Sequence, residues 1–203
     1  MHNAILDAAR LIVDEKGVDK LTLRGIAQHL GYSAGAIYEY FDSKEAIIEA
    51  LYFTSTGGLG QYMIETMAAV PPETDAVERM RTLAFAYREF AHRNAELYWL
   101  TFSAMKQRPE RLLRGHDEGL FSGFEGLVAV IEQGVADGLL IDTIPPLEIA
   151  FTAWSAVHGF VSLELSGHLK DHPATGEPLA ADSEDHFFDQ LIEILFHGFV
   201  RHR

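Results

Sequence analysis

The segment GYSAGAIYEYFDSKEAI, residues 31–47, places a run of small residues next to a cluster of aromatic ones. On a helical wheel that turns about 100° per residue, Ile37 and Phe41 share one face, and Gly35 and Glu39 lie opposite. The segment therefore predicts a short helix that buries one side. Its outer side is nearly free of bulky side chains.

A second short helix is predicted just before it, in the segment LTLRGIAQHL at residues 21–30. Thr22 can cap this helix, Gly31 can end it, and Ser33 can cap the helix that follows. Two short helices joined by a tight turn that contains glycine match a helix-turn-helix. Such a motif places its second helix in the major groove of DNA, where a bare front lets the backbone approach the base edges.

The remaining chain also shows helical periodicity, starting with an apolar stripe through residues 3–16 that stops at Gly17. Asp42 and Glu45 resemble a capping box for a helix from about Ser43 to Met67, with glycines 57, 58 and 60 as a weak point inside it. The segment AAVPPETD, residues 68–75, is the clearest break in the chain. Further helices are predicted over 75–93, 95–106, 117–137, 146–169 and 183–200, with a polar loop over 171–183.

No strand, internal repeat or long coiled coil is predicted, so the expected fold class is all-α. We expect two domains. The first, residues 1–47, is a three-helix DNA-binding domain that carries the helix-turn-helix. The second, residues 48–203, is a larger helical domain for ligand binding and dimerisation.

The composition is that of an ordinary globular protein, with 48% hydrophobic and 23% charged residues among 203. No apolar run approaches the roughly 18 residues that a membrane span needs, and no signal peptide heads the chain. The absence of cysteine excludes disulfides and thiolate chemistry. We expect a cytoplasmic protein with no membrane partner, no cofactor and no bound metal.

The net charge of −14 argues against a protein that coats nucleic acid through bulk electrostatics. Residues 1–50 carry eight acids and five bases, whereas residues 51–203 carry 22 acids and 11 bases. Any contact with DNA must therefore be local, made by a few well-placed groups. Tyrosine hydroxyls, a threonine at a helix start and a lysine in a first helical turn are suitable donors to phosphates.

Residues 22–47 together closely resemble the DNA-binding domain of TetR-family transcriptional regulators. The resemblance implies a homodimer that binds double-stranded operator DNA of palindromic sequence, and a divergent body that binds a small-molecule effector and usually releases DNA when occupied. Repression is the habit of this family. The matching positions are Thr22, Ile26, Ala27, Gly31, Ser33, Ile37, Tyr38, Tyr40, Phe41, Ser43, Lys44 and Glu45.

The resemblance also implies a set of DNA-contacting residues. Arg24 would reach a base or a phosphate, residues 33–35 would meet bases or backbone, and the tyrosines with the lysine would clamp phosphates. The residues expected to contact DNA are Thr22, Arg24, Ser33, Ala34, Gly35, Tyr38, Tyr40 and Lys44.

Two features depart from the family pattern. Many members carry a basic arm before the first helix, where this sequence offers only His2 and Arg10. Either the protein has no such arm, or the arm is left out of this sequence. Glu39 also faces the groove, where a carboxylate is costly unless it accepts from a cytosine amino group. Both features predict modest, salt-sensitive affinity for DNA with a shallow salt slope.

The segment WSAVHGFVSLELSGHL, residues 154–169, resembles the C-terminal WHG domain of one TetR subgroup. Trp154 and His158 lie at positions i and i+4, so they share one helix face. Either they line a ligand cavity, with the imidazole as its polar anchor, or they form a tryptophan–histidine pair in the core beside a dimer seam. The sequence leaves both interpretations open.

The effector pocket is expected to be apolar, with one or two polar groups. Most aromatic residues of the body must fill the core, and few cations point inward, which favours a neutral or cationic apolar ligand over a polyanion. The residues favoured for the pocket are Phe85, Tyr98, Phe102, Phe124, Trp154 and His158.

The last predicted helix is apolar on much of its circumference, so it must be covered on two sides. Pairing it with the 146–169 helix across a two-fold axis would form a four-helix dimer interface. The residues expected at this interface are Gly159, Ser166, Phe188, Leu191, Leu195 and Phe199.

An enzyme is one alternative, but the chain has no nucleophile motif, phosphate loop or zinc-protease motif. Glu164, His168 and His172 are spaced by four and could ligate a metal on one helix face. Pro173 suggests that the helix has ended by then, which favours exposed histidines without a metal. A second alternative is a dimer whose helix-turn-helix no longer binds DNA.

Overall fold

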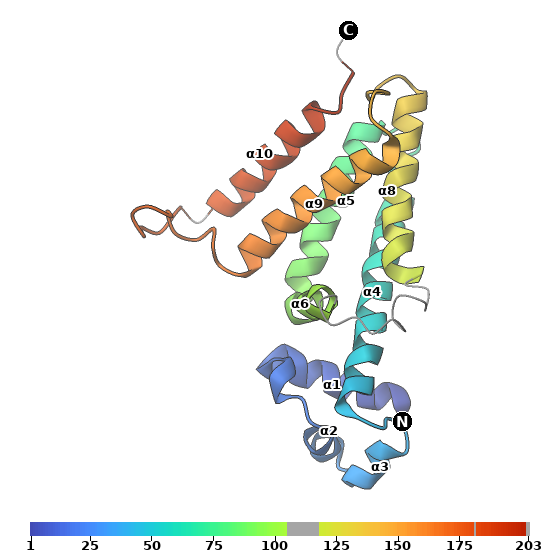
Figure 1. Cartoon of the computed structure of the whole chain (residues 1–203), viewed down its shortest axis with the longest axis vertical. Helices are drawn as coiled ribbons and strands as arrows, with labels where there is room; N and C mark the ends of the chain where they lie inside the picture. The colour runs from blue at the N-terminus through green and yellow to red at the C-terminus, as the bar shows by residue number, and fades with distance from the viewer. Residues whose placement is uncertain (105–117, 181, 202–203) are drawn as a thin grey trace. The chain divides into compact units, whose positions relative to one another are not determined.

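A computed structural model of the chain describes residues 1–104, 118–180 and 182–201. In these residues the structure is built from helices, with two isolated β-bridges and no β-strand (Figure 1). The predicted all-α class is confirmed. No helix among the described residues is long and apolar enough to cross a membrane.

The chain divides into two compact units, each with its own core. The first contains Met1–Leu59 and Arg93–Leu120, and the second contains Gly60–His92 and Phe121–Arg203. This division does not follow the boundary expected between residues 47 and 48, because α4 runs through both units and a later helix joins the first one. That boundary stays a prediction.

The first unit begins with three helices and a one-turn connection. Residue 17 ends the first helix as a glycine with φ of +81°. The helix α4 runs without a break through the glycine-rich segment that was predicted as its weak point. The elements are α1 (His2–Lys16), a 3-10 turn (Val18–Lys20), α2 (Leu23–Leu30), α3 (Ala34–Tyr38), α4 (Lys44–Ala69) and α6 (Ala95–Ala104).

Side-chain caps set the starts of the helices in this unit. The hydroxyl of Thr22 accepts from the backbone N–H of Gly25 at 3.0 Å, and the hydroxyl of Ser33 accepts from Ala36 at 3.3 Å. These two predicted caps are confirmed. The cap of α4 is Ser43, which accepts from the N–H of residue 46 at 3.1 Å, and not Asp42 of the predicted capping box. The helix starts one residue later than that box requires.

One apolar cluster holds α1, α2, α3 and the start of α4 together. Ile37 is fully buried and Phe41 nearly so, which confirms that the two share an inward face, and Ile26 of α2 is fully buried with them. Leu97 of α6 is also buried in this cluster. A helix far along the sequence therefore belongs to the core of the helix-turn-helix unit.

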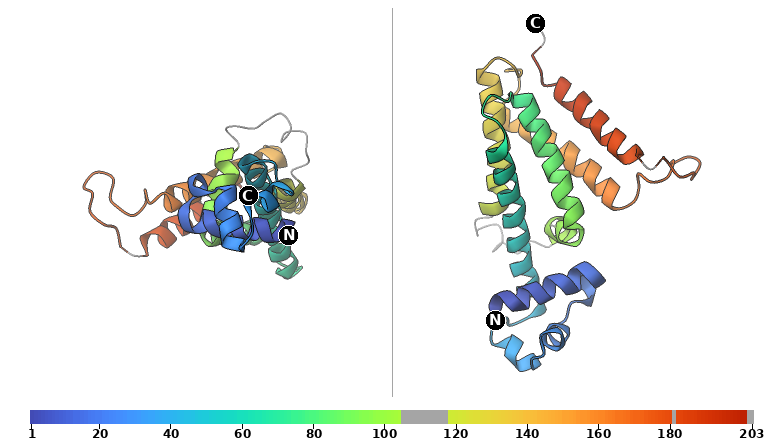
Figure 2. Two further views of the ribbon diagram at one scale, coloured as in Figure 1. Left: turned by 90° about the horizontal axis from the view of Figure 1, so that it is seen from below. Right: turned by 180° about the vertical axis from the view of Figure 1, so that it is seen from behind.

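The second unit is a set of helices from the body of the chain. In both Figure 1 and Figure 2, α9 and α10 lie side by side. Asp75 caps its first full helix by accepting from the N–H of Glu78 at 2.9 Å. The helices are α5 (Ala76–Arg93), α8 (Glu118–Ala136), α9 (Pro146–Leu165) and α10 (Ser183–His197).

Some helix ends differ from the predictions, and others cannot be compared with them. α9 ends at Leu165 instead of residue 169, because Gly167 takes a positive φ of +77° that an α-helix cannot contain. α10 ends at His197 instead of residue 200. Beyond it the chain pairs with the α8–α9 loop, since Ile141 donates to the carbonyl of Phe199 at 2.9 Å. Residues 105, 106 and 117 of the predicted helices lie outside the described residues.

Two glycines of α8 provide a matched test of packing. A Cβ at Gly134 would lie 2.6 Å from Cβ of Ala76 and 2.7 Å from Cδ1 of Leu140, whereas a Cβ at Gly126 would meet nothing within 4 Å. We expect Gly134→Ala to destabilise the protein by about 1–3 kcal/mol through overpacking. Gly126→Ala should stabilise it by up to about 1 kcal/mol through helix propensity. Urea unfolding of both variants measures the change in the free energy of unfolding. Equal changes would contradict the close packing around Gly134.

Candidate DNA-binding surface and effector site

The outer face of α3 is open, as the sequence predicted. Ile37 points into the core, while Tyr38 and Tyr40 leave 56% and 45% of their surface exposed. Gly35 is exposed, and a Cβ there would meet only the hydroxyl oxygen of Ser33, at 3.7 Å. The packing of the free chain therefore does not require glycine at this position, so the bare front is available to an external partner.

The eight residues expected to contact DNA all belong to the first unit, on α2, α3 and the segments that flank them. Six of them are exposed, and Ala34 and Lys44 are half-buried. The Thr22 cap needs a small neighbour, because a Cβ at Gly25 would lie 3.0 Å from the threonine hydroxyl. Lys44 lies in the first turn of α4, where backbone N–H groups and an ammonium can hold an anion together.

The prediction missed Tyr32, which lies in the turn between α2 and α3 and is 51% exposed. A large aromatic residue directly after the turn glycine was the available signal. The two cations considered for an N-terminal arm have other contacts. His2 stacks on Phe41 with ring centroids 4.7 Å apart, and Arg10 donates to the side chain of Asn94 at 2.6 Å.

An aromatic cluster joins α8 and α9 in the second unit. The rings of Phe124 and Phe151 are 4.7 Å apart, and that of Trp154 lies 5.8 Å from Phe124. One turn further along α9, the ring centroid of His158 lies 6.1 Å from that of Trp154. The structure thus brings together three of the six predicted pocket residues, with Phe151 added.

His158 also bonds to α5, through a contact of 3.0 Å between its Nδ1 and the hydroxyl of Tyr87. Burial lowers the pKa of His158 below its ordinary value of 6.5, so the imidazole is neutral at neutral pH. Tyr87 was missed by the sequence analysis. It lies on the buried stripe of Met80, Ala84 and Ala91, and a tyrosine in such a stripe needs a hydrogen-bond partner.

The other predicted pocket residues lie elsewhere. Phe85 packs edge-on against Phe188 of α10, with ring centroids 5.0 Å apart. Tyr98 and Phe102 are on α6 in the first unit, where their rings are 4.8 Å apart. The six residues therefore divide between the two units, four in the second and two in the first.

A separate surface depression lies between α5 and α10. Arg81 and Glu193, which are among its lining residues, pair with each other at 2.8 Å. None of the residues of the aromatic cluster lines this depression. Its lining residues are Val77, Arg81, Ile192, Glu193, Phe196, His197 and Val200.

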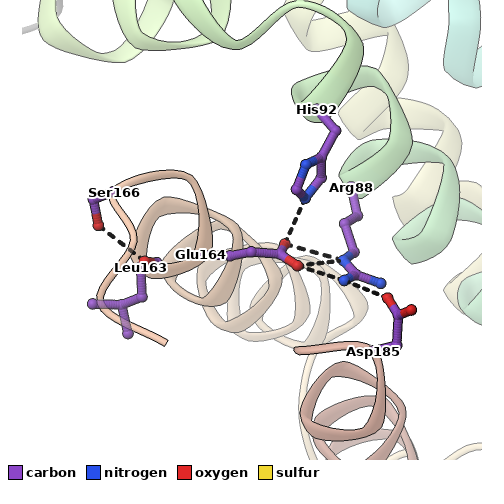
Figure 3. A network of polar contacts seen from close by, with 6 residues as sticks. All are labelled: Arg88, His92, Leu163, Glu164, Ser166 and Asp185. Carbon is purple, nitrogen blue, oxygen red and sulfur yellow. Dashed lines mark hydrogen bonds and ion pairs between the residues drawn. The ribbon is translucent and has the colours of Figure 1, made fainter. Parts of the chain in front are cut away.

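An ion cluster around the buried carboxylate of Glu164 joins α5, α9 and α10 (Figure 3). The Nε of Arg88 donates to both carboxylate oxygens of Glu164, at 3.1 and 3.0 Å, and its Nη2 also binds this carboxylate. The same Nη2 lies 2.7 Å from a carboxylate oxygen of Asp185 on α10. The Nε2 of His92, one turn further along α5, lies 2.8 Å from Glu164.

Glu164 is the most constrained charge in this cluster, because its side chain is only 1% exposed. Burial on its own would raise the pKa of Glu164. Hydrogen bonds and charges from Arg88 and His92 outweigh burial and hold that pKa below the ordinary value. The carboxylate therefore stays ionised at neutral pH, while the guanidinium of Arg88 lies over the ring of Phe188 at 4.9 Å.

The three residues of the metal-binding alternative are not brought together. Glu164 points to α5, whereas the Nδ1 of His168 lies 2.6 Å from the hydroxyl of Ser166 and that of His172 accepts from the N–H of Ala174. Both histidines follow the end of α9. Among the described residues, no group of three histidines or acids is arranged to hold a metal.

Only some of the residues predicted at the dimer interface are exposed on the surface of the single chain. Gly159 on α9 and Ser166 just after its end are exposed, and Leu191 and Leu195 are half-buried on α10. Phe188 and Phe199 are buried within the chain itself, at 0% and 7% exposure, so they do not offer the surface that the prediction required. Five further apolar residues on α9 and α10 are exposed and were not among the predicted interface residues: Leu147, Phe151, Leu163, Phe187 and Ile194.

A helix-turn-helix with an open second helix, joined to a helical body, defines a DNA-binding transcriptional regulator. Two family models match the sequence: "Bacterial regulatory proteins, tetR family" over residues 5–51, and "Tetracyclin repressor-like, C-terminal domain" over residues 80–195. The chain belongs to the TetR family, and it is a regulator and not an enzyme. The narrower WHG subgroup stays a prediction.

Curated relatives carry the same description. The chain is 29% identical over 170 residues to the uncharacterized HTH-type transcriptional regulator Rv0681 of Mycobacterium tuberculosis, covering 84% of this chain and 72% of the relative. It is 28% identical to the HTH-type transcriptional repressor KstR2 of Rhodococcus jostii, covering 77% and 78%.

Solved structures share the fold over nearly the whole chain. A protein of unknown function from Rhodococcus sp. RHA1 matches with a TM-score of 0.80 and 23% identity, covering 98% of this chain and 95% of that one. The regulator FadR from Bacillus subtilis, solved in complex with stearoyl-CoA, matches with a TM-score of 0.74 and 18% identity, covering 98% and 100%.

Two arginine–glutamate pairs that both start on α5 test the role of burial. Glu164→Gln removes the buried charge that Arg88 faces, and we expect a loss of about 3–5 kcal/mol in the free energy of unfolding. Glu193→Gln breaks the pair with Arg81, in which the glutamate is 66% exposed, and should cost no more than about 1 kcal/mol. Urea unfolding measures both, and equal losses would show that the cluster is not a buried constraint.

Proposed function

We propose that this regulator binds a palindromic operator as a homodimer, represses the adjacent genes, and is released by a small apolar effector bound in its body. The observation that carries the DNA-binding part is the open front of α3, with Gly35 exposed and tyrosines on either side of it. The regulator KstR2, a relative named as a repressor, supports the direction of control.

Recognition of DNA would rest on geometry more than on charge. With eight acids and five bases in residues 1–50, the first unit gives little general attraction to phosphates. Hydroxyl donors and the N-terminal turn of α4 would fix the register on the backbone. The bare front of α3 would then bring its backbone and Ser33 to base edges in the major groove.

The dimer would form through α9 and α10. Ile194 on α10 is 72% exposed and Leu163 on α9 is 48% exposed, so both offer apolar surface that a second copy would cover. The small residues Gly159 on α9 and Ser166 at its C-terminal end would allow a second copy to approach closely. Helix-turn-helix dimers bind half-sites about one turn of DNA apart, ~34–36 Å, and we expect the same half-site spacing for this dimer.

The effector site would be the aromatic cluster of α8 and α9 with the Tyr87–His158 bond at its edge. Its rings supply apolar surface, and a neutral imidazole beside a hydroxyl supplies hydrogen-bonding groups without a charge. Such a site suits an uncharged, oxygen-bearing apolar molecule better than a polyanion. A core histidine with a satisfied hydrogen bond is the alternative interpretation of the same contact.

Effector and operator would act on each other through helices that belong to both units. α4 runs through the boundary between them, at Leu59 and Gly60, so a shift of its body half moves its head half. Because the two binding equilibria are linked, DNA must weaken effector binding by the same factor by which effector weakens DNA binding.

DNA binding is tested by fluorescence anisotropy with labelled DNA from the protein's own promoter region, repeated over a range of salt. We expect saturable binding that Gly35→Leu abolishes, because the new side chain occupies the front of α3. Lys44→Ala should weaken binding and lower the slope of log affinity against log salt by about 0.9 for each phosphate that the lysine neutralises.

Lys16→Ala is the matched control, since it removes the same charge from an exposed position on α1. It should leave the salt slope unchanged. Binding that is indifferent to Gly35→Leu, or no saturable binding to the promoter DNA, would favour the alternative of a dimer whose helix-turn-helix has lost its DNA role.

Dimerisation is tested by light scattering of the purified protein and of Ile194→Arg. We expect a wild-type mass of two chains and a shift to one chain in the variant, because a buried unpaired charge opposes association. Ile64→Arg, at a 45% exposed position on α4, is the control and should leave the dimer intact. A wild-type protein with the mass of one chain would overturn the proposed interface.

A further inference from the structure

The junction between α5 and α6 is one residue long. α5 ends at Arg93 and α6 begins at Ala95, so Asn94 alone separates them. The boundary between the two units falls at this junction, between residues 92 and 93. The chain passes from one unit to the other at two further places, inside α4 and inside α8, but only here does it pass at a helix end.

On the body side, the end of α5 is fixed to α9. His92 binds the carboxylate of Glu164 at 2.8 Å, and Arg88, one turn earlier, binds the same carboxylate with two nitrogens. Glu164 is buried, so the position of this carboxylate is set by α9 itself. Any displacement of α9 relative to α5 must therefore be followed by His92 or break its bond.

On the head side, the start of α6 is fixed to α1. The amide oxygen of Asn94 accepts from Arg10 at 2.6 Å, and its carbonyl accepts from the N–H of Tyr98 at 2.8 Å. Leu97, three residues on, is 4% exposed within the apolar cluster that also holds α2 and α3. Asn94, two positions after His92, is thus part of the helix-turn-helix unit.

We propose that His92 and Asn94 are positioning residues that couple the placement of α9 to the orientation of the DNA-binding helices. The proposal rests on the proposed function, because it describes how an effector in the body would control the head. The Tyr87–His158 bond also joins α5 to α9, next to Arg88. An effector that displaces this bond shifts α9 along α5, and Glu164 transmits the shift to His92.

This route differs from the one through α4. It requires a specific pair of side-chain bonds, one on each side of residue 93, and not only a continuous helix. A merely structural role for His92 would affect α5 and α9, which lie in its own unit. A coupling role must also change α1, which belongs to the other unit. A measurement on α1 therefore distinguishes a structural role of His92 from a coupling role.

The first test is amide hydrogen exchange of the full DNA-free chain. We expect His92→Ala to speed exchange in α1 by about threefold or more, in line with the usual size of coupling between sites. His92→Gln keeps a side-chain donor for the carboxylate and should restore the wild-type rates. Arg81→Ala, which breaks another ion pair from α5 to α10, should leave α1 unchanged.

The second test is a double-mutant cycle with Asn94→Ala. If the two residues act in one route, His92→Ala should add nothing to α1 exchange once Asn94→Ala is present. In the anisotropy assay with the promoter DNA, His92→Ala should weaken binding by about threefold or more, and His92→Gln should not.

Unchanged α1 exchange in His92→Ala would overturn the proposal. So would equal acceleration in Arg81→Ala, or acceleration over α1, α2 and α3 alike, since each would indicate a general loss of stability. The exchange measurements need no DNA. A wild-type protein that fails to bind the promoter DNA would therefore count against the proposed function alone, while the exchange result still decides the coupling.

Discussion

The carboxylate of Glu164 is the constraint on which the body of this regulator depends. An ionised carboxylate with 1% side-chain exposure is tolerable only while its partners stay in place, so α5 must present Arg88 and His92 to α9 in one register. Asp185 extends the same requirement to α10, and the Arg88 guanidinium over Phe188 adds an apolar contact to it. Replacing such a cluster with apolar residues often costs little stability, which suggests that its value lies in fixing one arrangement of three helices.

The helix-turn-helix unit is organised by different means. Hydroxyl caps at Thr22, Ser33 and Ser43 satisfy the first N–H groups of successive helices, and one apolar cluster fills the space between them. Because caps and core already fix α3, its outer face needs no side chains for stability. That freedom explains why the front can be nearly bare. A rigid, bare helix brings its backbone close to DNA at little cost in ordering.

Local signals predicted the helices well, because caps, breaks and apolar stripes depend on residues that are close together in the sequence. What failed was the identification of neighbours in space. Glu164 was considered with two later histidines on one helix face, whereas α9 ends before them and its true partners are Arg88 and His92, far earlier in the chain. Phe188 was assigned to a dimer seam, because a helical wheel shows which faces are apolar and not which helix covers them. Tyr87 was within reach of sequence reasoning, since its position in a buried stripe implies a polar partner.

The contacts between α5 and α9 hold one titratable group neutral and another ionised. His158 has a lowered pKa, so its contribution to stability is complete above the ordinary value of 6.5 and declines as the pH falls below it. Glu164 also has a lowered pKa, so its contribution is complete above 4.5 and is lost only as the pH falls through the lower folded value. As the pH falls, the decline linked to His158 therefore begins at a higher pH than the decline linked to Glu164. The proposed effector site thus depends on a neutral imidazole, whereas the ion cluster depends on an ionised carboxylate. In the proposed mechanism, an uncharged ligand displaces the Tyr87–His158 bond, and Glu164 carries the resulting shift to His92.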